Sequence, residues 1–215
     1  MKLGDVFPNE EVITNMGPLK LYEHWGDGWG IFFTHPADYT PVCTTELSMV
    51  QKMAPEFAKR NVKMIALSCD SADSHNGWIN DIKHYSGEFS YPIIADEKRE
   101  LAVKFGMLDP DEKNAAGLPL TARAVFIVGP DRKLKLSILY PATTGRNFDE
   151  LLRVIDSLQL TANKKVATPA NWQNGGDCMV LPSVKGDQAT AMFPKMRVDK
   201  VPSGKEYMRF TPQPE

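Results

Sequence analysis

The feature that most constrains the fold is a strand, a helix and a second strand that follow one another within residues 29–68. Residues 29–34 are aromatic and apolar, as in a buried strand. Residues 44–60 carry apolar side chains at three- and four-residue steps, which predicts a helix, and Pro55 predicts a kink or a division within it. Residues 62–68 form the second apolar run. This order predicts a βαβ unit with parallel strands and a right-handed crossover.

The alternation continues along the chain and predicts an α/β fold. Helices are predicted over residues 74–86, 97–105 and 148–160, the last with Asn147 as its N-cap. Residues 91–95 predict a short strand. Strands predicted at 124–128 and 134–138 are separated by the turn Gly-Pro-Asp-Arg, which makes an antiparallel hairpin.

The composition changes near residue 163. Six of the 16 prolines follow this point, and helical periodicity is poor there. Apolar side chains such as Trp172 and Phe210 nevertheless exclude a disordered tail. We therefore expect a main domain over residues 1–162 and a loop-rich extension over 163–215. So small an extension is not expected to build a core alone, so it must pack on the main domain or on a second subunit.

Charge and hydropathy exclude several classes of protein. Twenty-five Lys and Arg against 27 Asp and Glu give a net charge of −2, so no basic excess points to nucleic acid or an anionic membrane. The longest apolar run is five residues, 124–128, far short of the ~20 that a membrane helix needs. The first residues lack the apolar core of a signal peptide. We expect a soluble, cytoplasmic protein.

The three cysteines, Cys43, Cys69 and Cys178, are too few and too far apart for a disulfide framework, a C-x-x-C dithiol or an all-cysteine zinc site. His75 and His84 share no zinc-ligand spacing with any cysteine, and we interpret them as ordinary surface residues. The sequence therefore predicts no metal site.

The segment from His35 to Glu46 is the candidate active-site loop. Thr40 suits the N-cap of a helix and Pro41 its first position, which places Cys43 in the first turn. Backbone N–H groups there lack helical partners and the helix dipole presents its positive end, and both effects favour a thiolate. The residues alone leave two interpretations open. Cys43 is either a small hydrophobe under the helix start or a reactive thiol, whose cationic partner is any of 25 Lys and Arg.

The same loop resembles the peroxiredoxin family. Pro36, Thr40 and Cys43 match its P-x-x-x-T-x-x-C signature, and the string His-Pro-Ala-Asp-Tyr-Thr-Pro-Val-Cys-Thr-Thr-Glu-Leu is similar to its one-cysteine subgroup. Further matching strings are Leu-Ser-Ile-Leu-Tyr-Pro-Ala-Thr-Thr-Gly-Arg-Asn-Phe from residue 136, Pro-Ala-Asn-Trp from residue 169 and Tyr-Met-Arg-Phe-Thr-Pro from residue 207. The resemblance covers essentially the whole chain.

This resemblance implies a thioredoxin-like fold with a C-terminal extension, and a thiol peroxidase that acts on hydrogen peroxide and organic hydroperoxides without a cofactor. Cys43 is implied to be the peroxidatic nucleophile, which becomes a sulfenic acid. Thr40 is implied to orient the peroxide and the thiolate, and Pro36 to shield the pocket from water.

Four further residues are implied to support this chemistry. Arg123 matches the family arginine that stabilises the thiolate and the transition state, and Arg146 matches a second, supporting arginine. Glu46 is implied to position both arginines through ion pairs. His35 matches the histidine beside the pocket, which is implied to contact bound peroxide or the oxidised sulfur.

The V-C-P motif of a resolving cysteine is absent, and we interpret Cys69 and Cys178 as structural thiols. The resemblance then implies an external reductant, such as glutathione delivered by a partner protein or another small thiol. It implies a homodimer, with larger rings known among relatives. A rival function stays open at this point, that of a redox sensor or chaperone-like protein whose assembly responds to oxidation of Cys43.

Some members of this subgroup carry a phospholipase A2 activity, with its serine in G-D-S-W-G. Here the string is Gly-Asp-Gly-Trp-Gly, and Gly28 occupies the serine position. Tyr22, rather than the nearby His24, occupies the position of the family's histidine. Because Gly28 has no hydroxyl nucleophile, we expect no phospholipase activity.

Overall fold

The computed structural model describes all 215 residues and divides into two compact units, Met1–Phe148 and Asp149–Glu215. The sequence predicts this boundary after residue 162 instead. The change in composition marks the end of helix α6 (Phe148–Asn163), whereas most of that helix belongs to the second unit. The reason is packing, because Leu160 lies against the apolar cluster of the second unit.

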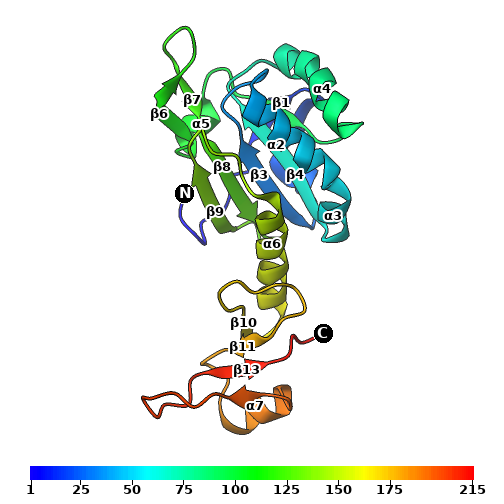
Figure 1. Cartoon of the computed structure of the whole chain (residues 1–215). Coiled ribbons are helices and arrows are strands. Elements are labelled where there is room, and N and C mark those ends of the chain that lie inside the picture. Colours follow the sequence, from blue (N-terminus) through cyan, green and yellow to red (C-terminus); the bar gives the residue numbers. More distant parts are fainter. The chain divides into compact units, whose positions relative to one another are not determined.

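The first unit is built on a seven-stranded mixed sheet of order β2-β1-β5-β4-β3-β8-β9 (Figure 1). Its strands are β1 (Glu11–Thr14), β2 (Gly17–Lys20), β3 (Trp29–Thr34), β4 (Val62–Ser68), β5 (Ile93–Ala95), β8 (Arg123–Val128) and β9 (Leu134–Tyr140). β3 and β4 are parallel neighbours, which confirms the predicted βαβ unit. β8 and β9 form the predicted antiparallel hairpin.

The helices of this unit are α1 (Leu21–Trp25), α2 (Pro41–Lys52), α3 (Ala54–Lys59), α4 (Ala72–Ser86) and α5 (Glu100–Lys104). The helix predicted after β3 is divided at Met53, because Pro55 starts α3 as a new helix. α4 begins earlier than predicted, since the Ser71 hydroxyl caps it by accepting the Ser74 N–H at 3.1 Å. α5 is shorter than predicted, since Arg99 before it has a left-handed backbone (φ 62°).

Two antiparallel hairpins of the first unit are not predicted by the sequence. They are β1–β2 and β6–β7, the latter formed by β6 (Leu108–Lys113) and β7 (Pro119–Thr121). Their strands are short and mix charged residues and prolines with few apolar ones, so their periodicity carries little signal.

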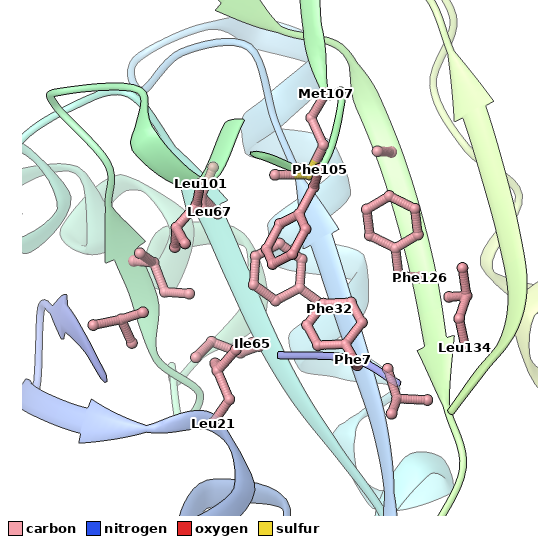
Figure 2. Close-up of a cluster of buried hydrophobic side chains, with 14 of the residues drawn as sticks. Phe7, Leu21, Phe32, Ile65, Leu67, Leu101, Phe105, Met107, Phe126 and Leu134 are labelled. Carbon is pink, nitrogen blue, oxygen red and sulfur yellow. The ribbon is translucent and has the colours of Figure 1, made fainter. Parts of the chain in front are cut away.

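An aromatic core covers one face of the sheet (Figure 2). Phe7, Phe32 and Phe105 pack with ring centroids 5.0–5.6 Å apart. Because side chains alternate along β3, Phe33 faces the opposite side, where its ring contacts Tyr91. The Tyr91 hydroxyl donates to the Leu47 carbonyl of α2, so the opposite face is the one that α2 covers. Figure 1 shows α2 lying across β3 and β4.

The second unit contains a small core of its own. Its four-stranded antiparallel sheet has the order β10-β11-β13-β12, with β10 (Val166–Ala167), β11 (Cys178–Val180), β12 (Arg197–Val198), β13 (Arg209–Thr211) and one helix, α7 (Gly186–Met192). The buried residues are Val166, Trp172, Cys178, Val180, Val184, Ala189 and Phe193. The sequence does not predict this small cluster. Its apolar residues are spread among turns without periodicity, and the strand pairing gathers them.

None of the helices in either unit combines the length and the apolar character that crossing a bilayer requires.

Candidate active site

The start of helix α2 positions Cys43. The helix begins at Pro41, directly after Thr40, whose backbone is extended, so Cys43 is the third helical residue, as the sequence predicts. The Thr40 hydroxyl does not cap the helix but donates to the Ala37 carbonyl at 2.8 Å. The Thr40 carbonyl accepts both the N–H (3.0 Å) and the hydroxyl (2.8 Å) of Thr44, which fixes the first turn. The Cys43 side chain is fully buried in this turn.

Arg123, the first residue of β8, brings a cation to the sulfur. Its Nη1 lies 3.4 Å from Cys43 Sγ and 2.8 Å from Glu46 Oε2. Its Nε donates to the Ala142 carbonyl at 2.9 Å, and Nη2 donates to the same oxygen. The guanidinium is thus held from both sides, and the arginine is only 2 % exposed.

Glu46, one turn after Cys43 on α2, joins this arginine to a second one. The Arg146 guanidinium donates to both Glu46 oxygens, from Nε at 3.0 Å and from Nη2 at 2.7 Å, and its backbone N–H donates at 2.7 Å. Burial alone raises the pKa of the Glu46 carboxyl, but Arg146 and then Arg123 hold it below its usual value. One carboxylate therefore faces two guanidiniums, and the positively charged Arg123 lies beside the Cys43 sulfur.

Pro36 and His35 lie in the same loop as Thr40, and both are buried. His35 Nε2 lies 2.9 Å from Asp38 Oδ1, while its Nδ1 has no hydrogen-bond partner. The structure therefore links Cys43 to three of the predicted residues, because Arg123 contacts both Cys43 and Glu46, and Glu46 contacts Arg146. It leaves His35 bound to an aspartate that sequence reasoning does not single out.

The interpretation of His75 as a surface residue is wrong. Its side chain is fully buried, and its Nδ1 lies 2.7 Å from Asp38 Oδ2. The signal was present in the sequence, because residues 75, 78 and 82 share one face of a helix, and Trp78 and Ile82 are fully buried as well. His84, on the other face, is exposed as predicted.

A cavity of about 510 Å³ opens beside the start of α2. It is lined by Tyr39, Thr40, Pro41, Thr44, Thr45, Asp81, His84 and Tyr85. Thr40 is thus shared between this cavity and the loop that carries the buried sulfur.

Comparisons with known proteins agree with this geometry. Residues 3–137 match the AhpC/TSA family, and residues 157–195 match the C-terminal domain of 1-Cys peroxiredoxin. The chain is 61 % identical to peroxiredoxin-6 of Gallus gallus, with 99 % of this chain and 98 % of that protein covered. It is 58 % identical to the human protein of the same name, with 99 % and 97 % covered.

Two solved structures are similar over almost their whole length. A mutant of the peroxiredoxin 6 of Arenicola marina has a TM-score of 0.98 at 60 % identity, covering 100 % of this chain and 99 % of that one. A yeast mitochondrial 1-Cys peroxiredoxin has a TM-score of 0.87 at 40 % identity, with 99 % of both chains covered.

This chain belongs to the peroxiredoxins, in their one-cysteine subgroup. It is a thiol peroxidase with the thioredoxin-like fold of that family and a C-terminal extension.

The other two thiols of this peroxiredoxin have different surroundings. Cys69, which follows β4, is partly buried, and burial raises its pKa to about 11. Cys178 lies in the core of the second unit, and burial raises its pKa also. A thiol whose pKa is raised is a poor nucleophile at neutral pH, so neither residue has the features of a second redox thiol.

We expect Glu46→Gln to destabilise the folded protein by about 3–5 kcal/mol at neutral pH, because it leaves two buried guanidiniums without a carboxylate. Since the folded-state pKa of Glu46 lies below the ordinary value of a glutamate, the carboxylate stabilises the protein fully above that ordinary value. Its contribution is lost as the pH falls through the folded-state pKa. Urea unfolding between pH 7 and pH 3 measures the difference between the two proteins, which shrinks in acid.

The matched control is Glu56→Gln, which removes an exposed carboxylate paired with Lys59 and Arg60. This change leaves the free energy of unfolding nearly unchanged. A Glu46→Gln protein as stable as the control at pH 7 contradicts the assignment.

Proposed function

We propose that Cys43 is the peroxidatic nucleophile and that Arg123 is its cationic partner. The thiolate attacks the terminal peroxide oxygen, the S–O bond forms and the O–O bond breaks. Sulfur is oxidised by two electrons to a sulfenic acid, and the leaving oxygen takes up one proton and departs as water or an alcohol. The observation that carries this proposal is the 3.4 Å contact between Arg123 Nη1 and Cys43 Sγ. A guanidinium in that place also faces the charge that develops on the leaving oxygen.

The neighbouring residues complete the proposed mechanism. Thr40 orients the peroxide, because this residue lines the cavity and precedes Cys43 by three positions. Pro36 excludes water from the buried loop. Glu46 and Arg146 keep Arg123 in place, since the shared carboxylate fixes both guanidiniums. His35 contacts the bound peroxide or the oxidised sulfur.

The cavity supports organic hydroperoxides as substrates besides hydrogen peroxide. A space of about 510 Å³ has room for an organic group, and Tyr39 and Tyr85 offer apolar ring faces there. Reaction needs only the terminal O–O group to reach the sulfur, and the rest of the substrate stays in the cavity.

The reductant comes from outside the chain. The sulfenic acid condenses with an external thiol to a mixed disulfide with loss of water, and a second thiol releases the Cys43 thiol. Glutathione, delivered by a partner protein, fits this scheme. The yeast 1-Cys peroxiredoxin is described as being resolved through the glutathione and thioredoxin systems. The raised pKa values of Cys69 and Cys178 support an external source.

We expect Arg123→Ala to slow the oxidation of Cys43 by hydrogen peroxide at least ~100-fold, the scale of losing one preorganised donor in the transition state. Stopped-flow measurement of the reduced protein with peroxide reads this rate directly. Arg60→Ala, which removes a surface arginine paired with Glu56, is the control and keeps the wild-type rate. Oxidation of the Arg123→Ala protein at near wild-type speed refutes the role.

We further propose that this peroxiredoxin has no phospholipase activity. Gly28 lacks a hydroxyl, and a Cβ atom placed on it meets the Asn61 carbonyl oxygen at 2.6 Å. The site therefore holds neither a serine nor the space for one without a shift of the backbone.

Gly28→Ser is expected to lower the free energy of unfolding by about 1–3 kcal/mol through overpacking and to release no fatty acid from phospholipid. Thermal unfolding and a fatty-acid release assay measure the two effects. Gly145→Ser is the control for stability, because its Cβ meets nothing closer than 3.5 Å. Fatty-acid release by the wild type, abolished by changes in this loop, shows the proposal to be wrong.

We also propose a homodimer and a cytoplasmic location. β9 is an edge strand of the seven-stranded sheet, and Leu139 on it is 65 % exposed. A long edge strand with an apolar side chain is a template for pairing with another copy. The three free thiols suit a reducing compartment.

Leu139→Glu is expected to weaken the dimer at least ~10-fold, because two carboxylates are brought together across the paired edge strands. Sedimentation of the reduced protein over a range of concentrations measures the dissociation constant. Val103→Glu, at an exposed position on α5, leaves it unchanged. A wild-type protein that sediments as a monomer at every concentration contradicts the dimer.

A further inference from the structure

A buried carboxylate lies between two buried histidines next to the candidate active site. Asp38 Oδ1 lies 2.9 Å from His35 Nε2, and Asp38 Oδ2 lies 2.7 Å from His75 Nδ1. The Ser74 hydroxyl donates to Oδ2 at 2.7 Å. Both imidazoles are fully buried. Burial alone raises the pKa of the Asp38 carboxyl, but the hydrogen bonds from both histidines hold it well below its usual range, so the group is a carboxylate.

The hydrogen bonds assign the protons of His35. A carboxylate only accepts, so His35 Nε2 must carry a hydrogen to bond Asp38. Burial lowers the pKa of His35, which favours the neutral ring, and a neutral ring carries one N–H only. His35 Nδ1 is therefore a bare lone pair. It is fully buried and has no hydrogen-bond partner.

His75 strengthens this assignment. Its Nε2 faces the Ile94 carbonyl at 3.2 Å, and its Nδ1 faces Asp38, so both of its nitrogens face acceptors. His75 thus donates its own Nδ1 hydrogen to Asp38. It does not take part in the hydrogen bond that His35 Nε2 donates. Together these contacts fix Asp38 Oδ2 toward His75 and leave Oδ1 for His35.

The position of His35 ties this network to the reacting sulfur. His35 continues β3, since its N–H donates to the Leu67 carbonyl, and it points to the same face as Phe33, two residues earlier. The Phe33 ring lies under the Arg146 guanidinium, 5.4 Å from its centroid. The His35 ring also packs on Trp78, whose Nε1 donates at 3.1 Å to Thr44, the residue after Cys43.

We propose that Asp38 and His75 are positioning residues, which hold His35 as its Nε2–H tautomer so that Nδ1 accepts an O–H hydrogen from the peroxide and then from the Cys43 sulfenic acid. The proposal rests on the proposed function of Cys43. A thiolate has no hydrogen to donate to this buried acceptor, whereas the S–O–H group has one. No proton is transferred to His35. The hydrogen bond only stabilises the O–H group of the peroxide, and then of the sulfenic acid, beside Nδ1.

The same atoms raise the question of a cation, because ligand atoms of His35, Asp38 and Asp70 lie within 4.8 Å of one another. Asp38 and Asp70 are already engaged, since Asp70 Oδ2 accepts the Asp38 N–H at 2.9 Å and the Ser68 hydroxyl at 2.7 Å. The hydrogen-bond network accounts for these contacts without an ion.

The test measures the tautomer and the rate in the same proteins. Nitrogen-15 spectra of the reduced wild type at pH 7, assigned with His35→Gln, are expected to show Nε2 protonated and Nδ1 bare. Asp38→Asn is expected to lose this single tautomer and to slow the oxidation of Cys43 by hydrogen peroxide about 10- to 100-fold, the scale of losing a partner that orients an imidazole. Asp73→Asn, the same change at an exposed position on α4, keeps the single His35 tautomer and an oxidation rate within about twofold of the wild type.

His75 supplies a conservative rescue. In His75→Asn the amide nitrogen takes the place of Nδ1 and still donates to Asp38, so the His35 tautomer and most of the rate are expected to survive. His75→Leu removes the donor, and both are expected to be lost. If Asp38→Asn fails to fold, the wild-type spectrum and the His75 pair decide the question.

Two results overturn the inference alone. They are a protonated Nδ1 in the reduced wild type, and an Asp38→Asn or His75→Leu protein that keeps its wild-type rate while the wild type reacts fast. A wild type whose Cys43 reacts no faster than free cysteine overturns the proposed function instead, and the two failures are thus distinguished.

Discussion

The buried carboxylate of Glu46 between Arg123 and Arg146 is the interaction on which the rest of the site depends. It joins helix α2 to the start of strand β8 and to the segment that follows β9. Three buried charges of this kind are expensive to desolvate and stable only when each is paired and hydrogen-bonded. Arg146 donates from Nε and Nη2 to Glu46 and from Nη1 to the Ala124 carbonyl, and Arg123 contacts both Glu46 and Cys43.

The proposed chemistry follows from this geometry rather than from the cysteine itself. A helix start supplies partial positive charge, and Arg123 supplies a full one at 3.4 Å, in a place that excludes water. Ionisation of a thiol raises the fraction of nucleophilic thiolate, but this gain is modest. The larger gain comes from groups fixed before the reaction and directed at the oxygen where charge develops. A guanidinium bound at the Ala142 carbonyl and at Glu46 needs no rearrangement when the peroxide arrives.

The sequence predicts the parts of this site that depend on local pattern. The stripe of α2, the Thr40-Pro41 start and the β8–β9 hairpin follow from periodicity and capping. The partner of Cys43 does not, because Arg123 and Cys43 are 80 residues apart and only the β3–β8 pairing brings them together. Family resemblance supplied that partner.

His75 was missed for a different reason. His75 shares a helix face with the buried Trp78 and Ile82, but Asp38, the partner that accounts for a polar ring in the interior, lies 37 residues away in the sequence. The C-terminal core was missed because its strands have two or three residues each, too few for a period to appear. In both cases tertiary contacts decide what local pattern leaves open.

The three thiols of this chain show how far the surroundings decide reactivity. Burial has the largest effect on Cys69 and Cys178 and raises the pKa of both thiols, although Arg99 near Cys69 and a hydrogen bond from Trp172 at Cys178 act in the opposite direction. Cys43 is fully buried, and the Arg123 guanidinium lies 3.4 Å from its sulfur. Of the three cysteines, only Cys43 has a guanidinium in contact with its sulfur. The external reductant proposed for the Cys43 sulfenic acid agrees with this difference, because burial raises the pKa of both other thiols.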